Sequence, residues 1–252
     1  MNYNQDDNLV YGRNPILELL KTDQPVDKIL IANCENKGSI VKIIAMAKEK
    51  GVPVKNVSKV KLDNLTYNAN HQNVVAFIAA YEYKEIDDIF EIAKSRNENP
   101  FIVILDEIED PHNMGAIIRT AEVSGAHGII IPKRRNVGLT PSVMKISAGA
   151  GRMLPIVRVS NLTNEIKELQ KRGIWVYCLE ASGENWTNFD YKGPMAVVVG
   201  SEGRGVSQLI KKTSDFIVSL PVFGKINSLN ASVAAGVFMY EVVKQRKSLI
   251  KN

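Results

Sequence analysis

The feature that most constrains the fold of this chain is a series of short, strongly apolar runs after Pro100, which alternate with segments of helical spacing. Runs rich in Val and Ile are typical of buried strands. Strands that alternate with helices form a mainly parallel sheet covered by helices on both faces. The sequence therefore predicts strands at 101–106, 128–131, 156–159, 174–179, 196–199 and 216–220, with helices at 114–123 and 229–248.

A smaller alternation of strands and helices precedes this series. Asn14 and Pro15 predict a helix start, with Asn14 as the N-cap and Pro15 in the first helical position. Gly51 follows a stretch of helical apolar spacing and predicts its end. The expected elements are strands at 28–32, 52–57 and 74–80 and a helix over 39–50. They form a compact unit of about 75 residues, a usual size for a small domain.

The domain organisation follows from length and charge. A chain of 252 residues is one large domain or two modest ones. Residues 84–99 carry five acidic and three basic side chains and end in a polar run, which predicts a connector. We therefore expect a disordered tail at 1–8, a first domain at 9–82, a linker at 83–99 and a second domain at 100–252.

Composition excludes several classes of protein. With 45% hydrophobic and 23% charged residues, the chain is neither collagen-like, nor a coiled coil, nor wholly disordered. Two distant cysteines, Cys34 and Cys178, are too few for a disulfide scaffold or a zinc ribbon, and the three histidines lack metal-ligand spacing. No signal peptide or membrane span is expected, so we expect a cytoplasmic protein.

The net charge of +5 is a mild indication of an anionic partner. Residues 37–61 hold seven lysines against one acidic side chain, Glu49. This stretch is either a solvated face or a patch that meets phosphates.

Common nucleotide-binding motifs are missing. A sheet of this kind usually binds its ligand at the carboxyl ends of the strands. The segment 149–154 begins as G-x-G but ends in Leu, so the dinucleotide fingerprint is incomplete. The chain also lacks a phosphate-binding loop of the ATPase type and a G-x-S-x-G nucleophile elbow.

Three other clusters each follow a predicted strand. In the first, residues 110–119, Asn113 is placed to cap a helix and Arg119 lies six residues further on. The second, 200–205, has three glycines, which permit close approach of a ligand, and one acid, Glu202. The third, residues 220–236, contains Ser228 and Asn230 at the start of a helix rich in small residues. Each cluster taken singly has a purely structural alternative. Asn113 suits a plain helix cap and Arg119 a side chain that reaches solvent. The second cluster suits a flexible turn, and the third suits a capped helix in a crowded core.

In order, spacing and placement after strands, the three clusters together resemble the three motifs of the SpoU/TrmH family of RNA ribose 2′-O-methyltransferases, within the SPOUT superfamily. The resemblance is close over residues 100–249. It is looser over 9–81, where VYGRNPILELL is similar to the opening of the RlmB-like branch.

The resemblance implies an α/β domain with a C-terminal trefoil knot that binds S-adenosylmethionine, in a homodimer. The front domain is then a small RNA-recognition module. At the positions that match the motifs, the implied cofactor-binding residues are Gly200, Glu202, Gly203, Ser219, Leu220 and Leu229.

The implied reaction is attack of a ribose 2′-OH on the cofactor methyl group, which needs no metal. The family's proposed base matches Arg119, but deprotonating an arginine of pKa about 12.5 at pH 7 costs about 7 kcal/mol. We therefore favour a protonated Arg119 that stabilises the forming alkoxide and grips a phosphate. The remaining implied catalytic residues are Asn113 (orienting Arg119 or the ribose), Glu202 (holding Arg119 or a loop), Ser228 (a proton route) and Asn230 (fixing the third cluster).

The expected substrate is a guanosine of large-subunit (23S) rRNA, because the front domain is similar to that of the RlmB-like branch. A tRNA substrate is one alternative. A non-catalytic RNA-binding or assembly factor with the same fold is another. The incomplete G-x-G-x-x-G argues against a nucleotide-dependent dehydrogenase.

Overall fold

A computed structural model describes residues 9–22, 24–33, 38–78, 81–226 and 228–247, and the predicted tail at 1–8 lies outside this part of the chain. The chain divides into two compact units. The first comprises Met1–Glu82 together with Gly138–Pro141, and the second comprises Tyr83–Val137 and Ser142–Asn252. Over the described residues, no helix is long and apolar enough to cross a membrane.

The first unit contains a four-stranded mixed sheet in the order β1-β4-β2-β3. β4 is antiparallel to both of its neighbours, while β2 and β3 are parallel. Its elements are β1 (Leu9–Tyr11), α1 (Arg13–Leu19), β2 (Val26–Ala32), α2 (Ser39–Glu49), β3 (Val54–Val57), α3 (Lys59–Leu65) and β4 (Val74–Ile78). α1 and α2 pack on one face of this sheet, and α3 packs on the other. The short elements β1 and α3 were not predicted, because neither has enough residues to establish a period.

The predicted cap at Asn14 is wrong. α1 begins at Arg13, and its N-cap is Gly12 with φ 94°. The Arg13 backbone N–H donates to Gln72 Oε1 at 2.9 Å. A glycine tolerates this positive φ, so the tight exit from β1 starts the helix earlier than the Asn-Pro pair indicates.

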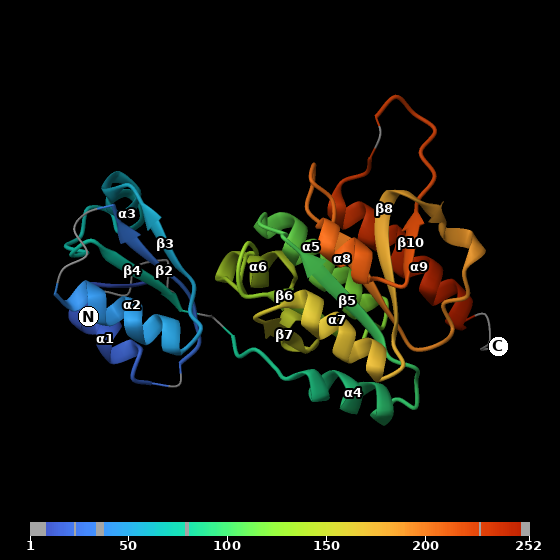
Figure 1. The fold of residues 1–252 in the computed structure, drawn as a ribbon, viewed down its shortest axis with the longest axis horizontal. Coiled ribbons are helices and arrows are strands. Elements are labelled where there is room, and N and C mark those ends of the chain that lie inside the picture. The colour runs from blue at the N-terminus through green and yellow to red at the C-terminus, as the bar shows by residue number, and fades with distance from the viewer. Residues whose placement is uncertain (1–8, 23, 34–37, 79–80, 227, 248–252) are drawn as a thin grey trace. The chain divides into compact units, whose positions relative to one another are not determined.

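The second unit is built on six parallel strands in the order β10-β8-β9-β5-β6-β7. Figure 1 labels β5, β6, β7, β8 and β10 of this sheet. The strands are β5 (Phe101–Asp106), β6 (Gly128–Pro132), β7 (Ile156–Val159), β8 (Trp175–Asn185), β9 (Met195–Gly200) and β10 (Phe216–Ser219). This confirms the predicted mixed α/β fold with a mainly parallel sheet. The trefoil knot stays a prediction.

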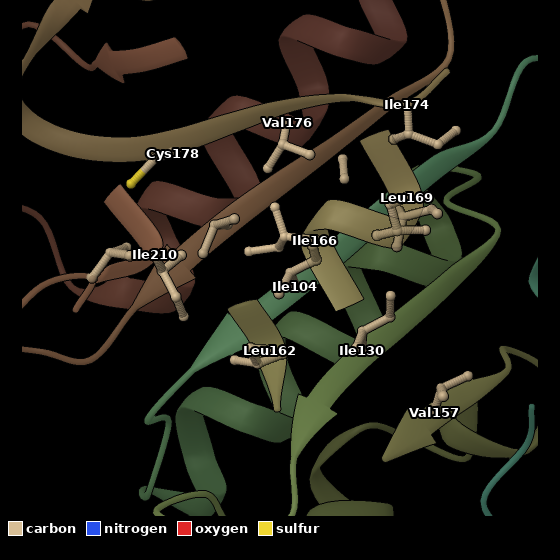
Figure 2. Packing of buried hydrophobic residues seen from close by; sticks show 14 of the residues in the cluster. Ile104, Ile130, Val157, Leu162, Ile166, Leu169, Ile174, Val176, Cys178 and Ile210 are labelled. Atoms are coloured by element: carbon tan, nitrogen blue, oxygen red, sulfur yellow. The ribbon is translucent and has the colours of Figure 1, made fainter. Parts of the chain in front are cut away.

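Helices cover both faces of this sheet. α4 (Ile86–Ser95), α7 (Leu162–Lys171) and α8 (Gln208–Thr213) contribute to the core on one face, where the side chains point toward one another (Figure 2). α5 (Pro111–Val123) and α9 (Ala231–Lys247) pack against each other on the opposite face. The remaining short elements are α6 (Pro141–Ile146), η1 (Ala150–Arg152) and η2 (Trp186–Asn188).

The stretch expected to be a linker is partly structured as α4, within the second unit. Ile89 and Ala93 are buried, and Ile89 belongs to the core on that face of the sheet. A Cβ placed on Gly128 would lie 2.4 Å from Ile89 Cγ1, so a glycine is needed where α4 meets the start of β6. α4 is therefore an amphipathic helix, with acidic side chains on its exposed face and an apolar stripe that packs on the sheet.

Candidate active site

A cavity of about 330 Å³ lies at the carboxyl end of β9 and beside the middle of β8, at Leu179, Glu180 and Ala181. The rest of its wall comes from the segments that follow β9 and β10 and from the start of α9. Of the residues predicted to bind a cofactor, Gly200, Glu202, Gly203, Leu220 and Leu229 line it, and so does Ser228. A cavity of this size suits a cofactor or other small molecule.

Ser219 does not line the cavity. Its Oγ donates to the backbone carbonyl of Gly183 at 2.9 Å, so the hydroxyl is turned toward β8. A cofactor-binding role for Ser219 stays a prediction.

The glycine-rich loop closes on itself. The Gly205 N–H donates to Ser201 O at 2.9 Å, which joins the two ends of the loop. A Cβ on Gly200 would lie 2.2 Å from the carbonyl carbon of Gly205, and Gly203 and Gly205 have φ of 86° and 67°. These positions therefore require glycine, which lets the loop turn tightly at the wall of the cavity.

Two carboxylates that the sequence analysis missed anchor the end of this loop. Glu180 accepts the N–H of Val206 at 2.5 Å, and Asp106 accepts the N–H of Ser207 at 2.8 Å. Glu180 also pairs with Lys211 at 2.7 Å. Burial raises the pKa of Asp106, and the hydrogen bond from Ser207 opposes this shift. Their positions in the sequence could have identified them, because Asp106 ends the predicted strand at 101–106 and Glu180 directly follows the predicted strand at 174–179.

A second hollow of about 260 Å³ adjoins the first and shares Ser201, Glu202 and Arg204 with it. Its other lining residues come from the loop after β5 and the start of α5: Glu107, Ile108, Glu109, Asp110 and Asn113. The first and second sequence clusters therefore meet around this hollow.

Glu202 joins the three predicted clusters. Its Oε2 accepts from Asn113 Nδ2 at 3.4 Å and from Asn230 Nδ2 at 3.2 Å. The other amide atom of Asn230, Oδ1, accepts the N–H of Ser232 at 3.0 Å, so Asn230 also caps α9. This confirms that Asn230 opens the last helix.

The prediction that Asn113 caps its helix is wrong. The N-cap is Asp110, whose side chain accepts the Asn113 N–H at 3.0 Å, and Pro111 takes the first helical position. Asn113 lies in the first turn with 8% of its surface exposed. Because a neighbour caps the helix, the Asn113 side chain is available to Glu202.

Arg119 lies away from this network. Six residues along an α-helix turn a side chain by about 240°, so Arg119 and Asn113 are on different faces of α5. Arg119 is exposed and makes no hydrogen bond or ion pair to any residue that the structure describes. The predicted hold of Glu202 on Arg119 is therefore not seen, and Glu202 binds two amides instead.

The arrangement can hold two molecules side by side. The first cavity combines apolar Leu220 and Leu229 with the polar Ser228 and Glu202 in a volume of about 330 Å³, which fits S-adenosylmethionine. The second hollow has carboxylate and amide groups that suit a polar acceptor. No group of three potential metal ligands gathers within the described ranges.

Comparison with known proteins gives consistent matches. The SpoU rRNA Methylase family matches residues 100–240, and the family described as RNA 2′-O ribose methyltransferase substrate binding matches residues 9–84. A Bacillus subtilis protein, YacO, assigned by name to the TrmH family of tRNA/rRNA methyltransferases, is 48% identical over 96% of this chain and 97% of its own.

Solved structures agree. The SpoU methyltransferase AviRb from Streptomyces viridochromogenes, in complex with AdoMet, has a TM-score of 0.61 at 26% identity and covers 95% of this chain and 90% of its own. An AdoMet-bound rRNA methyltransferase from Sinorhizobium meliloti has a TM-score of 0.58 at 22% identity, over 97% of this chain and 88% of its own. An A. aeolicus TrmH/SpoU tRNA-modifying enzyme has a TM-score of 0.54 at 29% identity, over 60% of this chain and 78% of its own.

Proposed function

Because this chain belongs to the SpoU rRNA Methylase family, and is thus an S-adenosylmethionine-dependent RNA ribose 2′-O-methyltransferase, we propose that it methylates a guanosine of large-subunit (23S) rRNA. The front unit supports ribosomal RNA as the substrate. The fold of the Sinorhizobium meliloti rRNA methyltransferase matches 97% of this chain, whereas that of the A. aeolicus tRNA-modifying enzyme matches 60%. Such a substrate places the reaction in the cytoplasm.

The observation that carries the proposal is the meeting of the two hollows at Glu202. One holds the methyl donor and the other receives the acceptor ribose, so the two reactants lie side by side. In the first, Gly200, Leu220 and Leu229 contribute backbone groups, with Gly203 beside them.

S-adenosylmethionine supplies a methyl group made electrophilic by its sulfonium. Bound in the first cavity, it would supply this methyl group to a ribose 2′-oxygen, and Ser228 or water would take up the hydroxyl proton. Protonated Arg119 stabilises the developing alkoxide. Asn113, held by Glu202, orients the ribose, and Asn230 holds Glu202 from the third cluster.

The isolated chain leaves Arg119 outside both hollows, which favours the homodimer that we also propose. α9 has an exposed apolar stripe of Val233, Val237 and Tyr240 at the spacing of one helix face. α5, which carries Arg119 and the exposed Val123, packs beside α9. A second copy on this face places Arg119 in the interface.

A methyl-transfer assay tests the function. The full chain is incubated with S-adenosylmethionine and unmodified large-subunit rRNA, with tRNA in parallel, and modified nucleosides are mapped by mass spectrometry. We expect one 2′-O-methylguanosine in the large rRNA, lost in Arg119→Ala. Asn113→Ala is expected to lose transfer while it still binds the cofactor.

The other outcomes separate the alternatives. A product in tRNA alone contradicts the rRNA assignment and keeps the enzyme class. Cofactor binding with no methylation of either RNA supports a binding or assembly factor.

A further inference from the structure

Glu107 forms ion pairs with two arginines at the rim of the second hollow. Its Oε1 accepts from Arg135 Nη1 at 2.8 Å, and its Oε2 lies 4.0 Å from Arg204 Nη1. The Glu107 side chain is 20% exposed, whereas Arg135 and Arg204 are 72% and 85% exposed. The carboxylate of Glu107 thus contacts one Nη1 atom of each arginine, while most of both arginine side chains is exposed to solvent.

Three loops from separate parts of the sheet bring these residues together. Glu107 directly follows β5, Arg135 lies just past β6, and Arg204 belongs to the glycine-rich loop after β9. β5 is hydrogen-bonded to both β6 and β9 in parallel register, so the three loops leave the same edge. The Val137 N–H also donates to Ile108 O at 2.8 Å, which ties the first two loops together.

The backbone is strained at both ends of the shorter ion pair. Glu107 has φ 60° and Arg135 has φ 55°, a left-handed conformation that non-glycine residues seldom adopt. Residues held in this region tend to cluster at ligand-binding sites, where the surrounding structure imposes the conformation. Lys133 and Arg134 precede Arg135, so this loop carries three consecutive cations.

The second hollow is lined mainly by acidic residues, whereas its rim carries arginines. The hollow is lined by the carboxylates of Glu107, Glu109, Asp110 and Glu202, against one guanidinium, that of Arg204. Phosphates are repelled from such an interior, while a ribose with its base is not. An RNA chain that places a ribose in the hollow must therefore pass its phosphates over the rim.

We propose that Arg135 and Arg204, positioned by Glu107, form a phosphate-binding pair that grips the RNA backbone on either side of the target ribose. A guanidinium matches a phosphate with two parallel N–H donors, and Arg135 uses only Nη1 on Glu107. The pair keeps a net positive charge after Glu107 is counted. This assignment rests on the proposed function, since it takes RNA as the substrate.

Salt-dependent binding tests the pair. Arg135→Gln, Arg204→Gln and the double variant are titrated with unmodified large-subunit rRNA transcript and with tRNA transcript at several salt concentrations. Each lost phosphate contact should lower the slope of log affinity against log salt by about 0.7. The KM for the methylated RNA should rise roughly three- to tenfold for each substitution, while affinity for S-adenosylmethionine stays unchanged.

Arg172→Gln is the matched control. Arg172 is 45% exposed and pairs with Asp87, and it lies just before β8, at the opposite edge of the parallel sheet. It makes the same change in charge and should leave the salt slope and KM unchanged. The phosphate-binding role of Arg135 and Arg204 would be rejected if the double variant kept the wild-type salt slope. It would also be rejected if Arg172→Gln lowered the salt slope by the same amount.

Glu107→Gln tests the positioning role. If Glu107 places the arginines, the variant keeps its salt slope but loses kcat, because the RNA is gripped in the wrong register. Tighter RNA binding with unchanged kcat shows that Glu107 only neutralises charge, and contradicts positioning.

Wild-type methyl transfer, measured in parallel, separates this proposal from the function. Pair-dependent binding without methylation of either RNA rejects the proposed function and supports the pair. Methylation of the large-subunit rRNA, with RNA binding that does not depend on Arg135 and Arg204, supports the proposed function and rejects the pair.

Discussion

Glu180 and Asp106 show how single residues hold the wall of the first cavity. Neither belongs to the three motifs, yet they accept the successive N–H groups of Val206 and Ser207 and so hold the end of the glycine-rich loop. The Glu180–Lys211 pair is mostly buried, at 12% and 17% exposed. Loss of one partner therefore leaves the other uncompensated.

We predict that Glu180→Ala weakens S-adenosylmethionine binding about tenfold, since a lost hydrogen bond that leaves a donor unpaired costs about 1–3 kcal/mol. Glu180→Gln keeps an oxygen for the Val206 N–H and should stay within about threefold of wild type by the same measure. Isothermal titration calorimetry measures both. Glu168→Gln, which removes an exposed acid on α7, is the control. Wild-type affinity in Glu180→Ala would contradict the anchoring role.

Cys178 is a core residue rather than a reactive thiol. It packs in the apolar cluster of the second unit, and burial raises its pKa to about 12 (Figure 2). We predict that folded Cys34→Ser protein does not react with a thiol reagent at pH 8, because the thiolate is the reactive form. One thiol should react after denaturation. Labelling of the native protein at a rate equal to the denatured one would contradict this.

At the scale of elements, the strands of the second unit were the most predictable parts. The predicted runs at 101–106 and 156–159 coincide with β5 and β7, because strands of a parallel sheet covered on both faces read as nearly continuous apolar runs. α5 begins three residues before its predicted start, since Asp110 rather than Asn113 caps it. Caps depend on a single hydrogen bond and are less predictable than periods.

His127 joins the start of β6 to β5 and to the preceding loop. Its Nδ1 accepts the N–H of Phe101 at 2.9 Å, and its Nε2 lies 3.0 Å from Glu98 Oε2. This geometry requires a neutral ring with the proton on Nε2. Burial lowers the pKa of His127 below its ordinary 6.5, against the opposing effect of Glu98.

The second unit should therefore lose stability below about pH 6.5. The unfolded histidine takes up a proton there while the folded one stays neutral, so the free energy of unfolding falls by at most about 1.4 kcal/mol per pH unit from this group. Urea unfolding followed by tryptophan fluorescence measures it, because both tryptophans, Trp175 and Trp186, lie in this unit. His127→Asn keeps an acceptor for Phe101 and should remove this part of the pH dependence; an unchanged dependence would argue against the assignment.

At the scale of the whole molecule, the exposed stripe on α9 has the clearest consequence. Val237 is 40% exposed between Val233 and Tyr240 at 50% and 51%. We predict that wild type has twice the chain mass of 27.9 kDa in light scattering, and that Val237→Glu has the single mass with an unchanged circular dichroism spectrum. The variant should also lose methyl transfer, because a buried charge separates the copies that place Arg119.

Val60→Glu is the control for this prediction, as it puts the same charge on an exposed valine, 65% accessible, in the first unit. It should leave the mass unchanged. A monomeric wild type, or a dimeric Val237→Glu protein, would contradict an interface on α9.

The sequence by itself determined the alternating elements and the three clusters that follow strands, because periodicity and motif spacing are local properties of the chain. Five of the six residues that it predicted to bind the cofactor line one cavity, and Ser219 does not. Only the tertiary structure decided which of these residues meet. The order β10-β8-β9-β5-β6-β7 brings Glu202 to Asn113, 89 residues away, and to Asn230, and brings Arg135 to Glu107. Strand order depends on packing and hydrogen bonds between distant segments, which no local pattern encodes.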